Sequence, residues 1–507
     1  MKVVLVKAKR LRRFSVFLLS LSVAVLSHAQ INDLERSTPE EEGIPSEKII
    51  AFFDSLMSSP NAEIHSTMIL RHGKVVAELY PEPFRAEYGH QLFSCSKTFT
   101  AAAVGLAIED NRLRLDDRLA SFFPEFLPDV VSEDLAAITV RDLLTMTSGF
   151  EVDTKMRTLH ADWIRSYLNH PIVAQPGKRF AYDSIDTYLL SAIVQRVTGM
   201  KIIDYLKERI FEPMHITEAY WEESPEGISC GGWGLYLQPE SMAKFGQLLL
   251  NEGQWEGKQL LPSSWVKEMT SAHVDDYYGY QMWMCDYPGA SRADGAYGQY
   301  IFIIPDKEMV IVITQCRKGD GAKQQDWIWK DLLPSLSDKS LTAGKSYDRF
   351  QKTVSHYKHA FPEGKAKSGK SKQIQSKEFT LSDNSLEWQS VRFDFNNNKE
   401  MIMHVKDKQG ETSQISLGYK DWKTSPIAFY PLNAIKSTLG SFSNVPKNFY
   451  VSGGYAWSSE NRLEIKLHFV NWMSAASISL DFEGNSLSAT LRNNFSDSLE
   501  QIDGAVK

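Results

Sequence analysis

Residues 93–106 read FSCSKTFTAAAVGL, a serine and a lysine at the head of a run of small and apolar residues. The pattern predicts a helix from Ser94 to about Glu109. Residues three apart lie on the same helix face, so Ser94 and Lys97 can meet. A serine hydroxyl becomes a nucleophile when a neighbouring base takes its proton, and a lysine amine that is held neutral is such a base. The spacing alone does not identify Ser94 as a nucleophile, because it recurs at Ser241/Lys244, Ser264/Lys267 and Ser355/Lys358.

The segments around this run predict a mixed sheet flanked by helices. Residues 66–80 form two apolar runs about a His-Gly-Lys turn, which indicates a hairpin. Residues 293–304 and 309–314 predict two further strands joined at Pro305. Helices are expected at residues 49–56, 139–149, 188–197, 241–250 and about 324–333. In the second of these, Thr139 is a plausible N-cap and Gly149 a stop.

Beyond Pro334 the pattern changes. Residues 363–377 carry five lysines among glycines and serines, which is typical of a solvated linker. From residue 380 apolar residues alternate with polar ones, as in Leu463, Ile465 and Leu467, so residues 380–507 predict a separate antiparallel β domain, a barrel or a sandwich. At 507 residues the chain is too long for one ordinary core, in keeping with this division.

Residues 1–29 have the form of a secretory signal peptide. Six basic residues precede an apolar run, residues 14–26, which ends at small residues before Gln30. A membrane anchor is the alternative, but 13 residues span a bilayer poorly. We therefore expect cleavage after Ala29, a secreted or periplasmic protein, and no stable membrane anchor after cleavage.

Composition argues against several classes of function. Cleavage would take the formal net charge from -7 to -13, which disfavours a nucleic-acid partner. The four cysteines show no metal-ligand spacing, and we expect neither a metal nor a required disulfide. No glycine-flanked serine elbow accompanies the histidines considered for a Ser-His-Asp triad, which are interpreted as surface or packing residues: His65, His72, His90, His160 and His273.

The order of these motifs resembles the β-lactamase-related serine hydrolases, which include class C β-lactamases, D-peptidases, esterases and 6-aminohexanoate-dimer hydrolases. The resemblance covers about residues 40–335, and the last of these branches is the most similar. It rests on the following segments in the family's order: 71–74 (RHGK), 93–97 (FSCSK), 139–149, 176–177 (PG), 182–184 (YDS), 231–232 (GG) and 295–299 (GAYGQ).

The resemblance implies a penicillin-binding-type α/β (α+β) catalytic domain with a central antiparallel sheet and a helical insertion. It divides the chain into 1–29, a catalytic domain 30–335, a helix and linker 336–379, and the β domain 380–507. It also implies roles for single residues. Ser94 would be the nucleophile and Lys97 its base or base partner, while Tyr182 would be a second base whose pKa Lys97 lowers and which can protonate the leaving group. The N–H groups of Ser94 and Ala296 would form the oxyanion hole.

Two departures from the family pattern concern the substrate. The tyrosine motif is usually Tyr-x-Asn, and here Ser184 replaces the asparagine, although it and Gly295 remain the expected substrate-binding residues. Penicillin-recognising members carry Lys-Thr-Gly before the last motif, whereas residues 293–295 read Ala-Asp-Gly. The cation that binds the substrate carboxylate is missing from that slot, and Arg292 lies one residue outside it.

The sequence thus predicts an exported serine hydrolase that cleaves a small-molecule or peptide-like ester or amide through an acyl-Ser94 intermediate, without a cofactor. A β-lactamase or D-alanyl peptidase acting on cell-wall peptides is the first alternative. The second is a non-catalytic sensor or binding protein on the same fold. Ser184 in place of asparagine and the missing cation are the departures from the family pattern that favour it.

Overall fold

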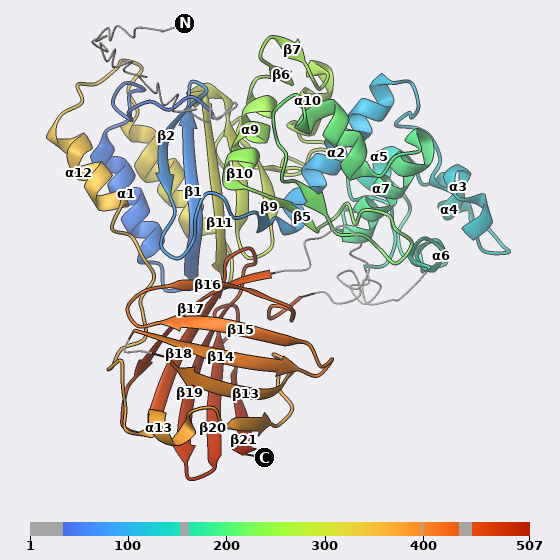
Figure 1. Cartoon of the computed structure of the whole chain (residues 1–507). Helices are drawn as coiled ribbons and strands as arrows, with labels where there is room; N and C mark the ends of the chain where they lie inside the picture. Colours follow the sequence, from blue (N-terminus) through green and yellow to red (C-terminus); the bar gives the residue numbers. More distant parts are fainter. Residues whose placement is uncertain (1–33, 153–161, 397–398, 435–448, 507) are drawn as a thin grey trace, which may run out of the picture. The chain divides into compact units, whose positions relative to one another are not determined.

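The computed structural model describes residues 34–152, 162–396, 399–434 and 449–506 (Figure 1). The predicted signal peptide, residues 1–29, lies outside this part of the chain. Residues from Leu34 onward form one compact unit. Within the described residues, no helix combines the length and the apolar character needed to cross a membrane.

A six-stranded antiparallel sheet forms the centre of the catalytic part, with strand order β2-β1-β11-β10-β9-β8. The predicted hairpin is confirmed as β1 and β2, but the predicted single strand at 293–304 is wrong. It is broken into β9 and β10, because Tyr297 and Gly298 adopt positive φ angles of 62° and 86° and reverse the chain. The strands are β1 (Ala62–Arg71), β2 (Lys74–Leu79), β8 (Trp283–Met284), β9 (Ser291–Gly295), β10 (Gln299–Ile304) and β11 (Met309–Arg317).

Helices cover both faces of this sheet, which explains why β10 and β11 are almost continuously apolar. In β11, Val310 and Val312 belong to the core on the side of α9 (Pro239–Leu250), whereas Ile311 and Ile313 belong to the core beneath α1 (Ser46–Met57). The second core also contains Phe350 of α12 (Lys345–Val354) and Ile328 of the π-helical turn η6 (Trp327–Leu332).

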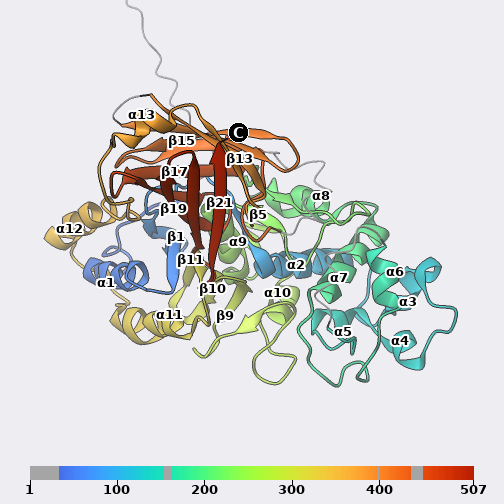
Figure 2. The same cartoon turned by 90° about the horizontal axis from the view of Figure 1, so that it is seen from below.

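The helical insertion packs around α2 (Ser96–Glu109), which is buried along nearly its whole length. Helices α7 (Ser184–Thr198) and α10 (Ser263–Met269) contact it (Figure 2). The helix predicted at 139–149 is shorter than expected. Thr139 forms a capping box with Asp142, but α5 (Val140–Leu144) ends before Met146, whose φ of 58° is incompatible with a helix. Further α-helices of the insertion are α3 (Leu119–Phe122), α4 (Glu133–Ala137), α6 (Trp163–Leu168) and α8 (Ile202–Leu206).

The C-terminal part is an antiparallel β barrel of ten strands within the described residues, in agreement with the predicted alternation. Its sheet runs in the order β15-β14-β13-β12-β21-β20-β19-β18-β17-β16, and a short parallel pairing of β15 with β17, the strand next to the other end, closes it. The strands are β12 (Glu378–Leu381), β13 (Trp388–Phe395), β14 (Glu400–Asp407), β15 (Thr412–Gly418), β16 (Lys423–Ile427), β17 (Phe449–Trp457), β18 (Arg462–Phe469), β19 (Ala475–Glu483), β20 (Ser486–Asn493) and β21 (Leu499–Val506).

The segment between the two parts is not free in solvent. Lys365 pairs through its backbone with Trp457 of β17, and α13 (Lys370–Ile374) buries Ile374 in the barrel core. The lysines of this segment remain half-buried or exposed, which explains why their composition resembles that of a linker. The predicted domain boundaries at residues 335 and 379 stay a prediction.

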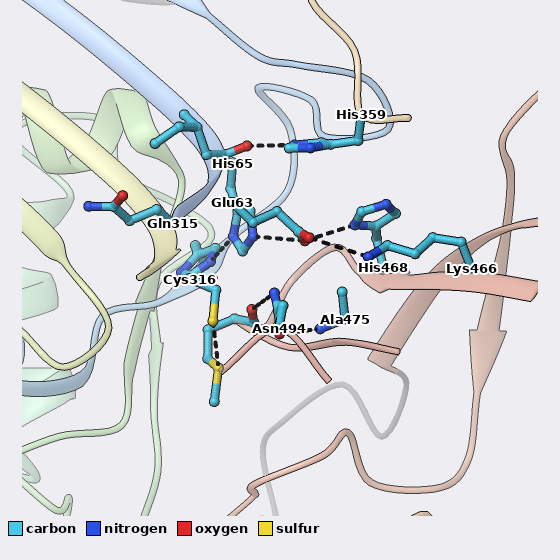
Figure 3. Close-up of polar contacts among 12 residues, drawn as sticks. Glu63, His65, Gln315, Cys316, His359, Lys466, His468, Ala475 and Asn494 are labelled. Carbon is cyan, nitrogen blue, oxygen red and sulfur yellow. Dashed lines mark hydrogen bonds and ion pairs between the residues drawn. The ribbon is translucent and has the colours of Figure 1, made fainter. Parts of the chain in front are cut away.

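Buried polar residues join the barrel to the central sheet (Figure 3). His468 of β18 donates from Nδ1 to Oε1 of Glu63 in β1 at 2.9 Å, and Lys466 Nζ lies 3.6 Å from Oε2 of the same carboxylate. On β11, the Cys316 thiol donates to Sδ of Met473 at 3.7 Å. The end of the central sheet and the barrel therefore share a buried interface.

Candidate active site

Ser94 lies in a 3-10 turn, η1 (Phe93–Cys95), immediately before α2. It therefore precedes the α-helix rather than beginning it, and its side chain is partly exposed. The turn follows the short strand β3 (His90–Gln91), and Gln91 Oε1 accepts from the Phe93 N–H at 2.7 Å. A buried strand and a buried helix thus fix Ser94 from both sides.

The small residues of α2 let other elements approach it closely. A Cβ atom at Gly105 would lie 2.1 Å from the Trp265 ring of α10, which is too close for any side chain at this position. The Trp265 indole also donates to the Ala101 carbonyl oxygen at 2.9 Å. The residues that follow Ser94 are thus small because α7 and α10 pack closely against α2.

Lys97 is buried and directed at Ser94, as the spacing predicts. Its Nζ donates to Ser94 Oγ at 3.1 Å, to Ser184 Oγ at 3.0 Å and to the Gly232 carbonyl oxygen at 2.7 Å. The Gly232 loop can approach because a Cβ there would meet the Ser184 carbonyl oxygen at 2.5 Å. The three acceptors hold the amine in one position beside the serine hydroxyl.

Tyr182 completes this group from the loop that precedes α7. The Lys97 Nζ lies 4.8 Å from the centre of its ring, and its phenol lies beside the Ser94 hydroxyl. Burial raises the pKa of Tyr182 well above its usual value, and Asp294 adds to this, although the Ser94 hydroxyl opposes it. The expected lowering of its pKa by Lys97 is therefore wrong for this arrangement, in which the phenol keeps its proton at neutral pH.

Two acidic residues hold the tyrosine loop in place. Asp183 caps α7 by accepting from the Ile185 N–H at 2.9 Å, and it accepts from the Tyr167 hydroxyl at 2.7 Å. The same hydroxyl lies 3.2 Å from Oδ1 of Asp186, where burial and Asp183 raise the pKa of the carboxyl. The helix cap and this buried pair fix the position of Tyr182.

The last motif lies beside the serine turn. A Cβ at Gly295 would be 2.3 Å from the Leu92 carbonyl oxygen, so this close approach requires glycine. Ala296 follows in the exposed turn between β9 and β10, and its carbonyl oxygen accepts from Gln299 Nε2 at 3.0 Å. The turn is closed by a bond from the Gly298 N–H to the Gly295 carbonyl oxygen at 3.0 Å.

These elements bring together a serine, a buried lysine and a tyrosine from three separate segments, next to a tight backbone turn. Residues 51–333, more than half of the chain, match the family model described as beta-lactamase. The chain belongs to the beta-lactamase family. It is a serine hydrolase of this family.

Two curated relatives and one solved structure illustrate its similarities. The 6-aminohexanoate-dimer hydrolase of Paenarthrobacter ureafaciens is 24% identical over 279 residues, which are 48% of this chain and 70% of that protein. Protein flp of Staphylococcus aureus (strain COL) is 25% identical over 142 residues, 27% of this chain and 28% of that protein. The octameric penicillin-binding protein homologue from Pyrococcus abyssi aligns with a TM-score of 0.47 and 16% identity, covering 90% of this chain and 99% of that one.

In this hydrolase the residues on either side of Ala293, the slot of the missing cation, form an ion pair with each other. Arg292 Nε lies 2.9 Å from Oδ2 of Asp294, and its Nη1 donates to the Met284 carbonyl oxygen at 2.8 Å. Both side chains lie on the same face of β9, since residues two apart in a strand do so. Burial raises the pKa of Asp294, although Arg292 opposes this. The charge of Arg292 is thus engaged within the protein.

Aromatic side chains that the sequence analysis did not single out surround Tyr182. Its ring centre lies 5.5 Å from that of Trp283 and 6.3 Å from that of Tyr278, and Phe180 and Tyr277 pack against these rings. Phe180, Tyr277 and Trp283 are only partly buried. The high density of aromatic residues in 277–283 is the sequence signal that could have revealed this cluster.

Other sequence candidates have different surroundings. His65 and His90 are buried and bonded to each other at 2.9 Å, and His160 lies outside the described residues. Nowhere in the described ranges do three or more His, Cys, Asp or Glu side chains gather as a metal site would require. The Gly232 carbonyl oxygen is a partner of Lys97 that no sequence pattern indicated, although the Gly231-Gly232 loop was predicted.

Proposed function

We propose that the protein hydrolyses an ester or amide bond through an acyl intermediate on Ser94. The observation that carries the proposal is the 3.1 Å contact between Lys97 Nζ and Ser94 Oγ, with the Tyr182 phenol beside the same hydroxyl. A nucleophile, a base within hydrogen-bond reach and a second acid form the minimum set for acyl transfer.

The reacting form has a neutral Lys97 amine, which donates to Ser184 and Gly232 and accepts from the Ser94 hydroxyl. In the first step Ser94 Oγ forms a bond to the substrate carbonyl carbon, and its proton passes to this amine. Because the raised pKa keeps Tyr182 protonated, the resting base is the lysine rather than the phenol. The N–H groups of Ser94 and Ala296 are the proposed donors to the oxyanion. When the carbon–oxygen or carbon–nitrogen bond breaks, Tyr182 gives its proton to the leaving group and regains one from the lysine ammonium.

Deacylation follows the same path with water as the nucleophile. Water adds to the acyl carbon and gives one proton to the amine of Lys97, and the acyl–oxygen bond then breaks. Ser94 recovers its proton, and the substrate acid is released. No cofactor enters any of these steps.

The proposed substrates lack a free carboxylate next to the reacting carbonyl. Ala293 supports this, because it leaves no cation where penicillin-recognising relatives present one, and the neighbouring Arg292 is paired with Asp294. The partly exposed rings of Phe180 and Trp283 suit an apolar group on the substrate. Rapid acylation by a fluorescent penicillin would instead favour a β-lactamase or a D-alanyl peptidase.

Labelling with a fluorophosphonate probe tests the proposal. The wild type should be labelled and should cleave short-chain nitrophenyl esters, whereas Ser94→Ala and Lys97→Ala should do neither. Ser264→Ala is the matched control, since Ser264 shares the S-x-x-K spacing but lies exposed on α10. An unlabelled wild type, or equal labelling of Ser94→Ala, would contradict the catalytic role and support a non-catalytic binding protein.

Export is part of the proposal and rests on the sequence of residues 1–29. The test is the mass and N-terminal sequence of protein recovered from a secreting host. A first residue of Gln30 is expected. An intact N-terminus in the membrane fraction would instead indicate an anchor.

A further inference from the structure

Two aromatic residues with left-handed backbone conformations flank the proposed reacting groups. Phe93 has a φ of 49° and precedes Ser94, and Tyr297 has a φ of 62° and follows Ala296. Bulky residues rarely adopt this region, because Cβ approaches the backbone too closely. Such conformations persist only where neighbouring residues hold them.

The barrel supplies those neighbours. The Phe93 ring lies 5.8 Å from Trp472, and the Tyr297 ring lies 6.2 Å from Phe495. Asn433 Nδ2 donates to the Tyr297 hydroxyl at 2.6 Å. The rings of Phe93 and Tyr297 also meet edge to face at 5.3 Å, so the two conformations support one another.

The three barrel residues come from one rim of the barrel. Asn433 follows β16, Trp472 lies between β18 and β19, and Phe495 lies between β20 and β21, positions that alternate along an antiparallel sheet. Two further contacts join these loops to each other. The Trp472 indole donates to the Leu432 carbonyl oxygen at 3.0 Å. Asn494 Oδ1 accepts from the Ala475 N–H at 2.8 Å, as Figure 3 shows.

We propose that this rim, defined by Asn433, Trp472 and Phe495, is a positioning element of the active site. Through Tyr297 it fixes the backbone of Ala296, and through Phe93 it fixes the turn that carries Ser94. The inference rests on the proposed function, since it concerns how the nucleophile and the oxyanion donors are aligned. The barrel then contributes to the acylation rate without touching the substrate.

The hydrogen bond between Asn433 and Tyr297 gives the sharpest test. Asn433 is exposed, so Asn433→Ala removes the bond without opening a cavity. Tyr297→Phe removes it from the other side. Because a displaced oxyanion donor acts on the transition state, each variant should lower kcat for a nitrophenyl ester about three- to tenfold with KM unchanged. The double variant should lose no more than either single one, because both changes remove the same bond.

Two further variants separate positioning from folding. Asn433→Asp keeps a partner for the hydroxyl, because the carboxylate accepts from the phenol, and should restore kcat to within about twofold of the wild type. Asn485→Ala is the matched control. Asn485 lies on the β19–β20 hairpin, where its Oδ1 accepts an exposed hydrogen bond from Lys377 Nζ, and removing this bond should leave kcat unchanged. The thermal midpoints should agree within about 2 °C.

The outcomes distinguish this inference from the proposed function. If the wild type reacts with the fluorophosphonate and Asn433→Ala and Tyr297→Phe react equally fast, the rim has no positioning role and the inference is wrong. Additive losses in the double variant, or an equal loss in Asn485→Ala, would also overturn it. A wild type that does not react at all refutes the proposed function itself, and this inference with it.

Discussion

Acid is expected to weaken the contact between β1 and the barrel, because a buried histidine must take up a proton there. His468 is fully buried and donates to Glu63. Burial raises the pKa of Glu63, but His468 and Lys466 more than offset this, so it lies well below its usual value. Burial lowers the pKa of His468 to about 4, although Glu63 opposes this. The ring of His359 also faces His468, at 5.2 Å (Figure 3).

The direction follows from proton counting. In the unfolded chain a histidine titrates near pH 6.5, so between that value and about pH 4 the unfolded state binds more protons at His468 than the folded state does. The free energy of unfolding is therefore highest above pH 6.5 and falls as the pH drops. For His468 alone, the loss between pH 8 and pH 5 is about 2 kcal/mol.

Urea unfolding at pH 8 and pH 5 measures this effect. His468→Gln can still donate to Glu63 but does not titrate, so its free energy of unfolding should fall by about 2 kcal/mol less than that of the wild type. His273→Gln is the control, since His273 is exposed and bonds a backbone carbonyl oxygen on α10. If the free energy of unfolding falls equally in the wild type and His468→Gln, His468 is not the source of the pH dependence. The same conclusion follows if His273→Gln reduces the fall as much as His468→Gln does.

Three predictions concern the active site. Tyr182→Phe should lower amide hydrolysis about 10²- to 10⁴-fold but nitrophenyl ester cleavage far less, because nitrophenolate leaves without a proton; equal losses would rule out the leaving-group role. Ser184→Ala removes an acceptor of the lysine amine at 3.0 Å and should lower kcat about tenfold with little change in KM, and a change in KM alone would indicate substrate binding instead. Gly295→Ala places a Cβ 2.3 Å from the Leu92 carbonyl oxygen and should slow fluorophosphonate labelling more than about 100-fold, whereas Gly344→Ala, which meets no atom within 4 Å, should label normally.

Local signals predicted most of the elements correctly. Thr139 and Asp142 form a capping box that begins α5, and the alternation of Leu463, Ile465 and Leu467 follows the inward face of a barrel strand. Both signals act between neighbours in the chain. They fix where an element begins and which side is buried, because helix and strand periods are properties of the backbone.

The errors fall where the backbone leaves those regular conformations. Tyr297 reads as one more β-forming residue within an apolar run, yet its positive φ ends β9 and begins β10. Met146 lies within the predicted helix 139–149, yet its positive φ prevents α5 from continuing. Contacts from distant segments hold these residues in conformations that their own propensities disfavour, so no local pattern could reveal them.

The local sequence is enough to place Ser94 and Lys97 together, since three residues of helix-like chain bring them within reach. What surrounds that pair depends on the tertiary fold. Folding brings the Gly232 carbonyl oxygen 2.7 Å from an amine 135 residues away, and Asn433 to the hydroxyl of Tyr297, 136 residues away. Contacts of this range depend on how buried surfaces pack, and packing is a property of the whole chain rather than of any one segment.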